Sequence, residues 1–383
     1  MSRMLTASGF YMFLANKLLG VNGRKVVFIS YGGKSYSDNP RAISEKLHEL
    51  QPEFEIVWLF KNPEEKEKIV PGYVRCVEFG SHAALKELAT AKFWVDNATK
   101  PHTIYKSGKQ VYIQTWHGDR GFKKVLYDSP FITKNDVIIE NEICDLYIAG
   151  SAAGARKAKT AFRYSGEIMK AGCPRNDVLV ENDPAKARAV KAQLKLGDKA
   201  KILLYAPTLR REASKGHTLQ SLGEIDLIET LQALEKKTGE PWVCLVRAHS
   251  AVKGLSGIPG GSSAVIDVTA YEDMSDLLLV SDFLITDYSS SAGDFALLNR
   301  PIILFQADRD DYIKKDRSFY FDLDESPFMI VKAQEELVKL IAGLDWAAVP
   351  QNCKEILDFY GAVETGRASE KVVGYIQGKY LKS

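Results

Sequence analysis

The stretch KVVFISYGGKSYSDNPRAISEKLHEL, residues 25–50, indicates the fold class most clearly. Its first seven residues form an apolar run that is typical of a buried parallel strand. Residues 39–50 then show helical spacing, with Pro40 in the first turn, where proline is tolerated. A buried strand followed directly by a helix is the repeating unit of a parallel α/β sheet. We therefore expect this unit to recur along the chain.

The recurrence is visible on both sides of a charged interruption. Residues 180–201 are rich in charge and poor in apolar residues, which predicts a linker or hinge helix. Residues from Gln334 onward are predicted to be helical. The other predicted strands are EIVWLF (55–60), VRCVEF (74–79), FWVDN (93–97), VYIQTW (111–116), DLYIAGS (145–151), KILLYAPT (201–208), PWVCLVRAH (241–249), SAVIDVT (263–269), FLITDYSS (283–290) and PIILFQ (301–306).

Two consecutive α/β runs of similar size predict an α/β protein of the GT-B type. In that arrangement two Rossmann-like domains have parallel sheets that face a central cleft. We place the N-terminal domain at residues 1–185, including an amphipathic N-terminal helix, and the C-terminal domain at 186–350. The C-terminal helices, residues 351–383, are predicted to pack back toward the N-terminal domain.

Composition excludes several classes of protein. The formal net charge is +2, so the global balance does not suggest a nucleic-acid partner. Five scattered cysteines without a CxxC pair argue against a disulfide framework and for a reducing, cytoplasmic compartment. No stretch is long and apolar enough to span a membrane. Residues 1–20 predict an amphipathic helix, which is either a packing element or an anchor at the membrane surface.

Ligands of open parallel sheets collect at the carboxyl ends of the strands, so polar residues there are candidates. Asp287 ends one predicted strand, and Ser289, Ser290 and Ser291 open the next helix. A helix N-terminus with added hydroxyl donors suits a phosphate group. Plain N-capping is the alternative, since Ser and Asp are also preferred caps.

Basic residues follow two further strands of the second domain. Arg247 and His249 come after the strand at 242–246 and together would bind a diphosphate. Thr208 and Arg210 stand at the end of the strand that begins at residue 201, and arginine matches phosphate oxygens in a bidentate manner. For each of these features alone, solvated surface is an equal or better interpretation.

In the first domain the candidate is His117, which follows the strand VYIQTW and precedes Gly118. Histidine titrates near physiological pH and is the most common general base. A structural histidine in a turn is the alternative. One domain thus offers a base and the other offers phosphate-binding features, which together predict a transferase. The sequence has no HExxH, GxxxxGK[ST] or GxGxxG pattern, so we predict no metal and no cofactor.

An ordered set of motifs resembles the CDP-glycerol glycerophosphotransferase family of teichoic-acid synthesis. The resemblance extends from about Lys25 to Phe305. The motifs are SYGGKSYSDNPRAI (30–43), FWVDNA (93–98), QTWHG (114–118), CPRND (173–177), YAPTLR (205–210), VRAH (246–249) and ITDYSSSAGDFALLNRPIILF (285–305).

The resemblance implies a peripheral enzyme on the cytoplasmic face of the plasma membrane. Such enzymes transfer glycerol phosphate from CDP-glycerol to a hydroxyl of a lipid-linked glycan acceptor and release CMP. His117 then matches the base for the acceptor hydroxyl in the first, acceptor domain. The second domain becomes the CDP-donor domain, where the residues that match those associated with the donor's diphosphate and glycerol are Arg210, His249, Asp287, Ser289 and Ser290. His249 is expected to be a catalytic residue together with His117.

Alternatives remain open at this point. One is a CDP-ribitol ribitolphosphotransferase or another GT-B nucleotide-sugar transferase or epimerase, and another is a non-catalytic scaffold that binds CDP-polyols or glycans. After its WHG motif the chain continues with Asp119 and Arg120, where many members have Thr-Pro, so the acceptor is uncertain. Basic residues near aromatic ones at 123–127 and 155–166 predict either contact with the membrane surface or a solvated face.

Overall fold

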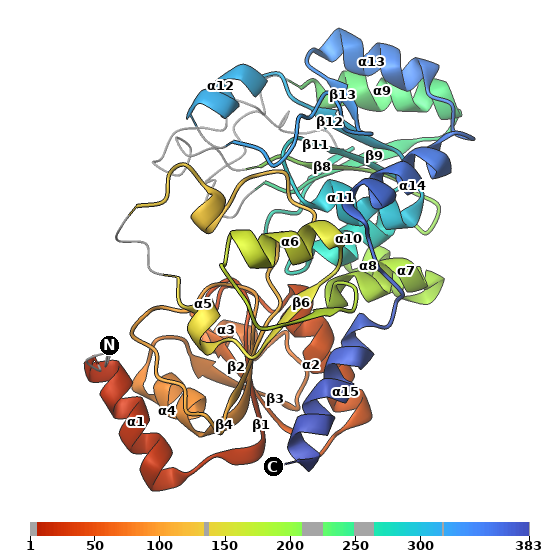
Figure 1. The fold of residues 1–383 in the computed structure, drawn as a ribbon. Helices are drawn as coiled ribbons and strands as arrows, with labels where there is room; N and C mark the ends of the chain where they lie inside the picture. Colours follow the sequence, from red (N-terminus) through yellow and green to blue (C-terminus); the bar gives the residue numbers. More distant parts are fainter. Residues whose placement is uncertain (1–5, 134–137, 209–224, 249–263, 316–317, 383) are drawn as a thin grey trace. The chain divides into compact units, whose positions relative to one another are not determined.

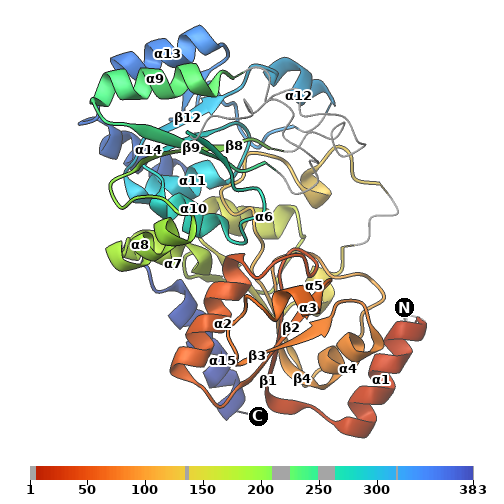
Figure 2. The same ribbon diagram turned by 180° about the vertical axis from the view of Figure 1, so that it is seen from behind.

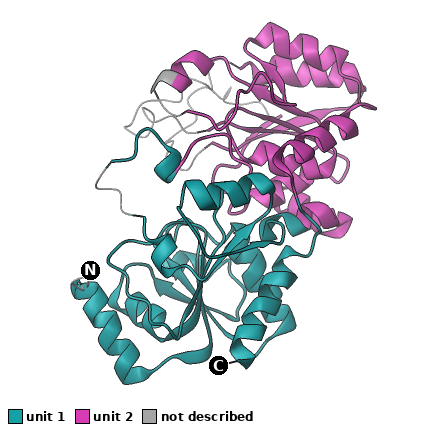
Figure 3. Cartoon of the chain, viewed as in Figure 1, with its two compact units in different colours: residues 1–119, 126–177, 363–383 teal, residues 120–125, 178–362 magenta. Residues whose placement is uncertain are grey.

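The computed structural model describes residues 6–133, 138–208, 225–248, 264–315 and 318–382. The chain divides into two compact units, which Figure 3 shows in different colours. Unit 1 comprises residues 1–119, 126–177 and 363–383, and unit 2 comprises residues 120–125 and 178–362. The domain limits at residues 185 and 350 stay predictions from the sequence.

Unit 1 is built on a seven-stranded parallel sheet with the order β3-β2-β1-β4-β5-β6-β7. Chain order reverses between β1 and β4, which makes their carboxyl ends the topological switch point. The strands are β1 (Asn22–Ile29), β2 (Glu55–Phe60), β3 (Val74–Glu78), β4 (Ala91–Asp96), β5 (Val111–Gln114), β6 (Leu146–Ala149) and β7 (Glu167–Lys170).

Helices cover both faces of this sheet (Figures 1 and 2). Because strand residues alternate between faces, Val26 and Phe28 belong to one core cluster and Val27 and Ile29 to the other. Helices α2 (Asp38–Leu50) and α15 (Ala368–Leu381) pack on the first face, and α1 (Ala7–Leu19) and α4 (His82–Thr90) on the second. The remaining helices of unit 1 are α3 (Pro63–Lys66), α5 (Glu140–Ile143) and α6 (Ala152–Thr160).

Unit 2 contains a six-stranded parallel sheet with the order β10-β9-β8-β11-β12-β13. Its strands are β8 (Lys201–Ala206), β9 (Trp242–Val246), β10 (Val265–Asp267), β11 (Phe283–Thr286), β12 (Ile302–Phe305) and β13 (Met329–Val331). Its helices are α8 (Pro184–Gln193), α9 (Leu227–Thr238), α10 (Met274–Val280), α11 (Ser291–Phe295), α12 (Arg309–Lys315), α13 (Gln334–Gly343) and α14 (Val349–Tyr360), and α7 (Asp177–Glu181) begins at the boundary of the units.

These two parallel sheets with flanking helices confirm the predicted α/β class. Two short edge strands, β7 and β13, were not predicted. Both are only partly buried, so neither shows the continuous apolar run of a central strand. Within the charged stretch at 180–201, helix α8 packs against α10 inside unit 2. The C-terminal helix α15 packs on α2 inside unit 1.

The Asp119 carboxylate fixes the start of α6 in unit 1. It accepts hydrogen bonds from the Gly150 backbone N–H (2.8 Å) and the Ser151 hydroxyl (2.5 Å). A Cβ on Gly154 would lie 1.7 Å from Asp119 Oδ2, so the helix can approach the carboxylate only because residue 154 is glycine. The Asp119 carboxylate thus has two neutral hydrogen-bond donors and takes part in the packing of α6.

The close approach of Asp119 to Gly154 predicts that a methyl group added at residue 154 destabilises the fold. We expect Gly154→Ala to lower the free energy of unfolding by about 2–4 kcal/mol, because the carboxylate must move away from its buried donors. The matched control is Gly374→Ala in α15, where an added Cβ meets nothing within 4 Å. That control should be neutral or stabilising. Urea unfolding followed by circular dichroism measures both; equal midpoints for the two variants would contradict the account.

Candidate functional site

His117 lies at the carboxyl edge of the unit 1 sheet. The strand ends are aligned there, because Ile29 pairs with Asp96 and Asp96 with Gln114. The segments that follow β1, β4 and β5 therefore meet at one edge. His117 is the third residue after β5, beside the switch point between β1 and β4. This is the position at which open α/β sheets bind ligands.

The His117 ring has a defined tautomer. Its Nδ1 atom lies 2.7 Å from the backbone carbonyl oxygen of Asn97. A carbonyl oxygen only accepts, so Nδ1 carries the proton and Nε2 keeps its lone pair. The half-buried ring is also flanked by Trp116 at 4.2 Å and Tyr31 at 5.1 Å between ring centroids. These contacts fix the ring plane and present Nε2 as a proton acceptor.

Charged groups surround the ring from three elements. Burial lowers the pKa of His117, while the Asn97 carbonyl and the nearby carboxylates of Asp38 and Asp96 raise it and the Arg175 guanidinium lowers it. The net shift of the His117 pKa is downward, which favours the neutral imidazole at neutral pH. A neutral imidazole is the form that a general base requires.

The backbone around His117 is conformationally unusual. Tyr31, Asp38 and Trp116 have φ values of 48°, 64° and 48°, in the left-handed region that non-glycine residues seldom occupy. Each such residue costs about 1–3 kcal/mol, and residues of this kind cluster at functional sites. Three of them around a single histidine indicate that the local geometry is retained for a purpose other than stability.

A second cluster lies at the carboxyl edge of the unit 2 sheet. Asp287 follows β11 and Thr208 follows β8, and these strands are neighbours at the switch point of this sheet. The Asp287 carboxylate accepts hydrogen bonds from the Thr208 backbone N–H (2.9 Å) and hydroxyl (2.6 Å). Gln306, which follows β12, donates to the Asp287 carbonyl at 3.0 Å. The structure therefore brings Thr208 and Asp287 together, with Asp287 holding the loop after β8.

Of the remaining predicted residues of unit 2, Arg247 and the three serines are described by the structure, and Arg210 and His249 are not. Arg247 follows β9 at the same edge, and its backbone N–H donates to the Tyr205 carbonyl at 2.9 Å. Ser289, Ser290 and Ser291 open the five-residue helix α11, and the Ser289 hydroxyl lies 2.9 Å from that of Ser291. Arg210 and His249 lie outside the described residues.

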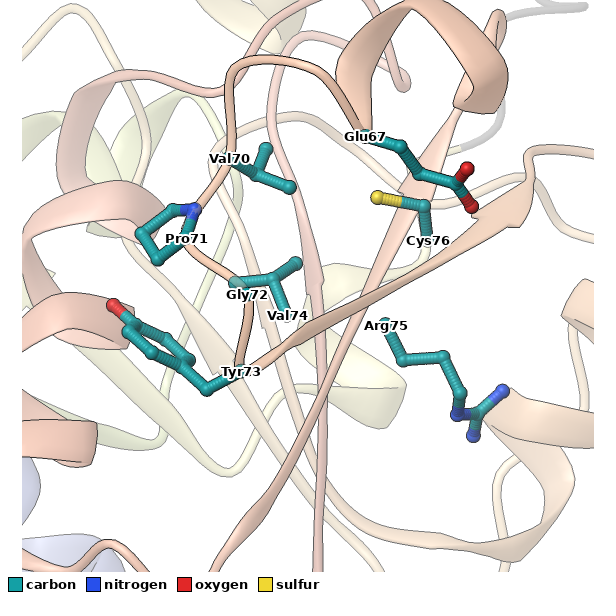
Figure 4. A pocket seen from close by; sticks show the side chains of 8 residues that line it. All are labelled: Glu67, Val70, Pro71, Gly72, Tyr73, Val74, Arg75 and Cys76. Atoms are coloured by element: carbon teal, nitrogen blue, oxygen red, sulfur yellow. The ribbon is translucent and has the colours of Figure 1, made fainter.

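The pocket in Figure 4 lies elsewhere, along β3 at the edge of the unit 1 sheet. It has a volume of about 440 Å³ and contains none of the predicted site residues. Its Arg75 guanidinium is paired with Glu55 and Glu87. Burial raises the pKa of the Cys76 thiol to about 11, so this thiol is not a nucleophile at neutral pH. The pocket offers no chemistry for group transfer.

No group of three or more His, Cys, Asp and Glu side chains in the described ranges is arranged to hold a metal ion. Among the described helices, none has the length and apolar character needed to cross a bilayer.

Sequence reasoning missed the residues that surround His117. Tyr31, Asp38, Asn97 and Arg175 all lie within motifs that support the family resemblance, but no role was assigned to them. The sequence therefore marked these four residues as parts of the motifs, but it did not indicate what they do. Their shared position became visible only when the ends of β1, β4 and β5 were aligned.

Two Rossmann-like units, each with a parallel sheet and a polar cluster at its switch point, define a protein of the GT-B class, in agreement with a similar solved structure. The match to a family model over residues 10–378 makes the assignment specific. The chain belongs to the CDP-glycerol:poly(glycerophosphate) glycerophosphotransferase family.

Similar proteins agree with this assignment. A teichoic acid poly(glycerol phosphate) polymerase of Staphylococcus epidermidis is 34% identical over 94% of this chain and 51% of its own length, so the chain spans about half of that relative. A teichoic acid glycerol-phosphate transferase of Staphylococcus aureus is 32% identical over 92% of each chain. The solved structure of the wall teichoic acid polymerase TagF is 30% identical, with a TM-score of 0.82 over 98% of this chain and 94% of its own.

Proposed function

We propose that the protein transfers glycerol phosphate from CDP-glycerol to a hydroxyl group of a lipid-linked glycan acceptor and releases CMP. The observation that carries this proposal is the position of the His117 imidazole at the switch point of unit 1, where Nδ1 donates to the Asn97 carbonyl and leaves the Nε2 lone pair available. Burial lowers the pKa of this imidazole, which favours its neutral form. Membership of the family and the activities of the similar proteins support the donor and the reaction type.

The reaction balances with a single proton transfer. Nε2 of His117 removes the proton from the acceptor hydroxyl, and the resulting oxygen forms a bond to the phosphorus that bears glycerol. The bond from that phosphorus to the bridging oxygen breaks, and CMP leaves with this oxygen. The protein's contribution is mainly positioning and stabilisation of charge, as in other phosphoryl transfers.

The donor-binding residues follow from the family resemblance and the edge of unit 2. Arg210, Arg247 and His249 bind the diphosphate, and the serines after β11 add hydroxyl donors to the phosphate oxygens. Thr208 and Asp287 position this edge through their two hydrogen bonds. We expect no metal requirement, because these groups supply the charge that stabilises the leaving CMP.

The experiment is a donor comparison on purified protein in EDTA. CDP-glycerol, CDP-ribitol and UDP-N-acetylglucosamine are each supplied with a lipid-linked disaccharide that carries one glycerol phosphate or none. Mass spectrometry of the acceptor should show the gain of one or more glycerol phosphate units. A gain of ribitol phosphate would establish the alternative polyol, and transfer of a sugar would overturn the proposal.

We propose contact with the inner face of the plasma membrane as the way in which the enzyme reaches its acceptor. Helix α1 buries Met12 and Ala15 but exposes Phe10, Leu14 and Leu18, which are 52%, 41% and 82% exposed. These three residues are spaced by four positions and so form one apolar stripe. By contrast, Lys157 in the basic helix α6 is buried and donates to the Asp119 carbonyl, so its charge is internal.

The stripe predicts the effect of making it polar. Replacing Phe10, Leu14 and Leu18 together by serine should weaken sedimentation with anionic phospholipid vesicles by about tenfold or more, because apolar area no longer enters the bilayer interface. The control replaces three other exposed apolar residues, Leu50, Ile69 and Leu381, by serine. Equal sedimentation of both triple variants would argue that α1 is only a packing element.

A further inference from the structure

The Asp38 carboxylate and the Arg175 guanidinium form a buried ion pair beside the histidine. Arg175 Nη1 lies 3.3 Å from both carboxylate oxygens, and the two residues are 6% and 7% exposed. Buried ion pairs contribute little net stability, because desolvation of both charges offsets their attraction. Asp38 moreover occupies the left-handed backbone region. The stability of the fold alone therefore does not explain why the structure has this ion pair.

One route of hydrogen bonds runs from the ion pair to the segment before His117. The Arg175 backbone N–H donates to Asn39 Oδ1 at 3.0 Å. Asn39 Nδ2 in turn donates to the Trp116 carbonyl at 2.8 Å and reaches the Thr115 carbonyl at 3.3 Å. Asn39 is fully buried, so no water competes for these bonds. The peptide that leads into the histidine is thus fixed from the side of the ion pair.

A second route reaches the ring itself. The Tyr31 hydroxyl donates to Asp38 Oδ2 at 2.6 Å, and the Tyr31 backbone N–H donates to Asn97 Oδ1 at 2.8 Å. The Asn97 carbonyl accepts the His117 Nδ1 proton at 2.7 Å. Because the Asn39 N–H also donates to Asp38 Oδ1 at 2.6 Å, the two routes form a closed ring that begins and ends at Asp38.

We propose that Asp38 and Arg175 are a positioning pair for His117, which fixes the imidazole through both routes and balances the charge beside it. The pair does not touch the reacting atoms; it acts through the histidine. This inference rests on the proposed role of His117 as the base. Among the described residues, the charged groups that act on the ring are Asp38 from α2, Arg175 after β7 and Asp96 at the end of β4.

The two members of the pair have opposite electrostatic effects on the ring. A purely structural role would not predict opposite changes in the pKa of His117 when each member is neutralised, so these changes test the proposal. Asp38→Asn removes the carboxylate and should lower the pKa of His117, whereas Arg175→Gln should raise it, each by roughly half a pH unit or more. Asparagine tolerates the left-handed backbone region, so the first variant keeps the turn. Arg175→Lys keeps the positive charge, so the pKa of His117 should stay at its value in the unmodified protein.

The pKa is measured by NMR on the full chain labelled at histidine Cε1, with the His117 resonance assigned by its loss in His117→Gln. Glu49→Gln, the same chemical change at an exposed end of α2, is the control and should shift nothing. Tyr31→Phe tests the second route without a change of charge. If Arg175→Gln does not fold, the comparison is between Asp38→Asn, which should lower the pKa of His117, and Arg175→Lys, which should leave it unchanged.

A parallel pH profile of kcat/KM with CDP-glycerol separates the two claims. We expect Asp38→Asn and Arg175→Gln to shift the pKa read from the His117 resonance in opposite directions, and to shift the acidic limb of the pH profile in the same opposite directions. Opposite shifts in the resonance with an unmoved acidic limb would support the positioning pair but remove His117 as the base. No shift of the resonance, or shifts of one sign in both variants, would overturn the positioning pair.

Discussion

Replacing His117 by alanine is expected to lower kcat by about 10²–10⁴-fold while leaving the affinity for CDP-glycerol nearly unchanged. The size follows from the contribution that a positioned general base makes to a proton transfer. The separation of the two parameters follows from position, because His117 lies in unit 1 and the predicted donor-binding residues lie in unit 2. Rapid-quench measurement of CMP release and calorimetric titration of CDP-glycerol provide the two values.

The control for this variant is another histidine of unit 1. His102 is exposed and lies outside the Asp38–Arg175 ring, so His102→Ala should leave both parameters unchanged. Loss of CDP-glycerol binding in His117→Ala, with full turnover at saturating donor, would show that the histidine binds the donor and is not the base.

Breaking the buried ion pair between Arg120 and Asp294 is expected to destabilise unit 2 by about 3–5 kcal/mol. Arg120 is completely buried, and its Nη2 lies 2.5 Å from Asp294 Oδ1 in helix α11. Its side chain also packs where Gly293 leaves room, since a Cβ there would lie 2.8 Å from Arg120 Cβ. Arg120→Met leaves the Asp294 carboxylate without its main charge partner in an environment of low polarity.

Thermal unfolding of three variants tests this prediction. Asp294→Leu added to Arg120→Met should recover much of the loss, because a buried pair is replaced by apolar groups. Lys354→Met breaks the exposed Lys354–Asp358 pair of α14 and should leave the melting temperature unchanged. If Arg120→Met and Lys354→Met behave alike, the Arg120–Asp294 pair does not stabilise unit 2 as described.

The structure shows where the two residues that depart from the common motif lie. In the sequence, this departure at residues 119 and 120 left the identity of the acceptor open. In the structure Asp119 holds the start of α6, and Arg120 is paired inside unit 2. Both side chains contribute to packing within their units, and the identity of the acceptor stays a prediction.

The sequence predicted the central strands of both sheets because buried parallel strands are continuous apolar runs, as in residues 26–29 and 283–286. It did not predict β7 or β13, whose partly exposed residues lack that signal. For the same reason the charged segment at 180–201 suggested a linker, although α8 is simply an exposed helix of unit 2.

The candidate site was predicted only in part. Strand-end position was enough to select His117, Thr208 and Asp287. It was not enough to select Asp38 and Arg175, which are 137 residues apart and meet only through the fold. A sequence pattern shows that such residues recur in a motif, but the hydrogen-bonded ring that gives them a common role exists only in three dimensions.

The proposed metal-independent transfer with His117 as the base is tested by acceptor-dependent CMP release from CDP-glycerol, measured for the unmodified protein and His117→Ala side by side in EDTA. We expect release by the unmodified protein that requires the lipid-linked acceptor and falls by at least about a hundredfold in the variant. Equal release by both proteins, or release that needs an added metal ion, would contradict it.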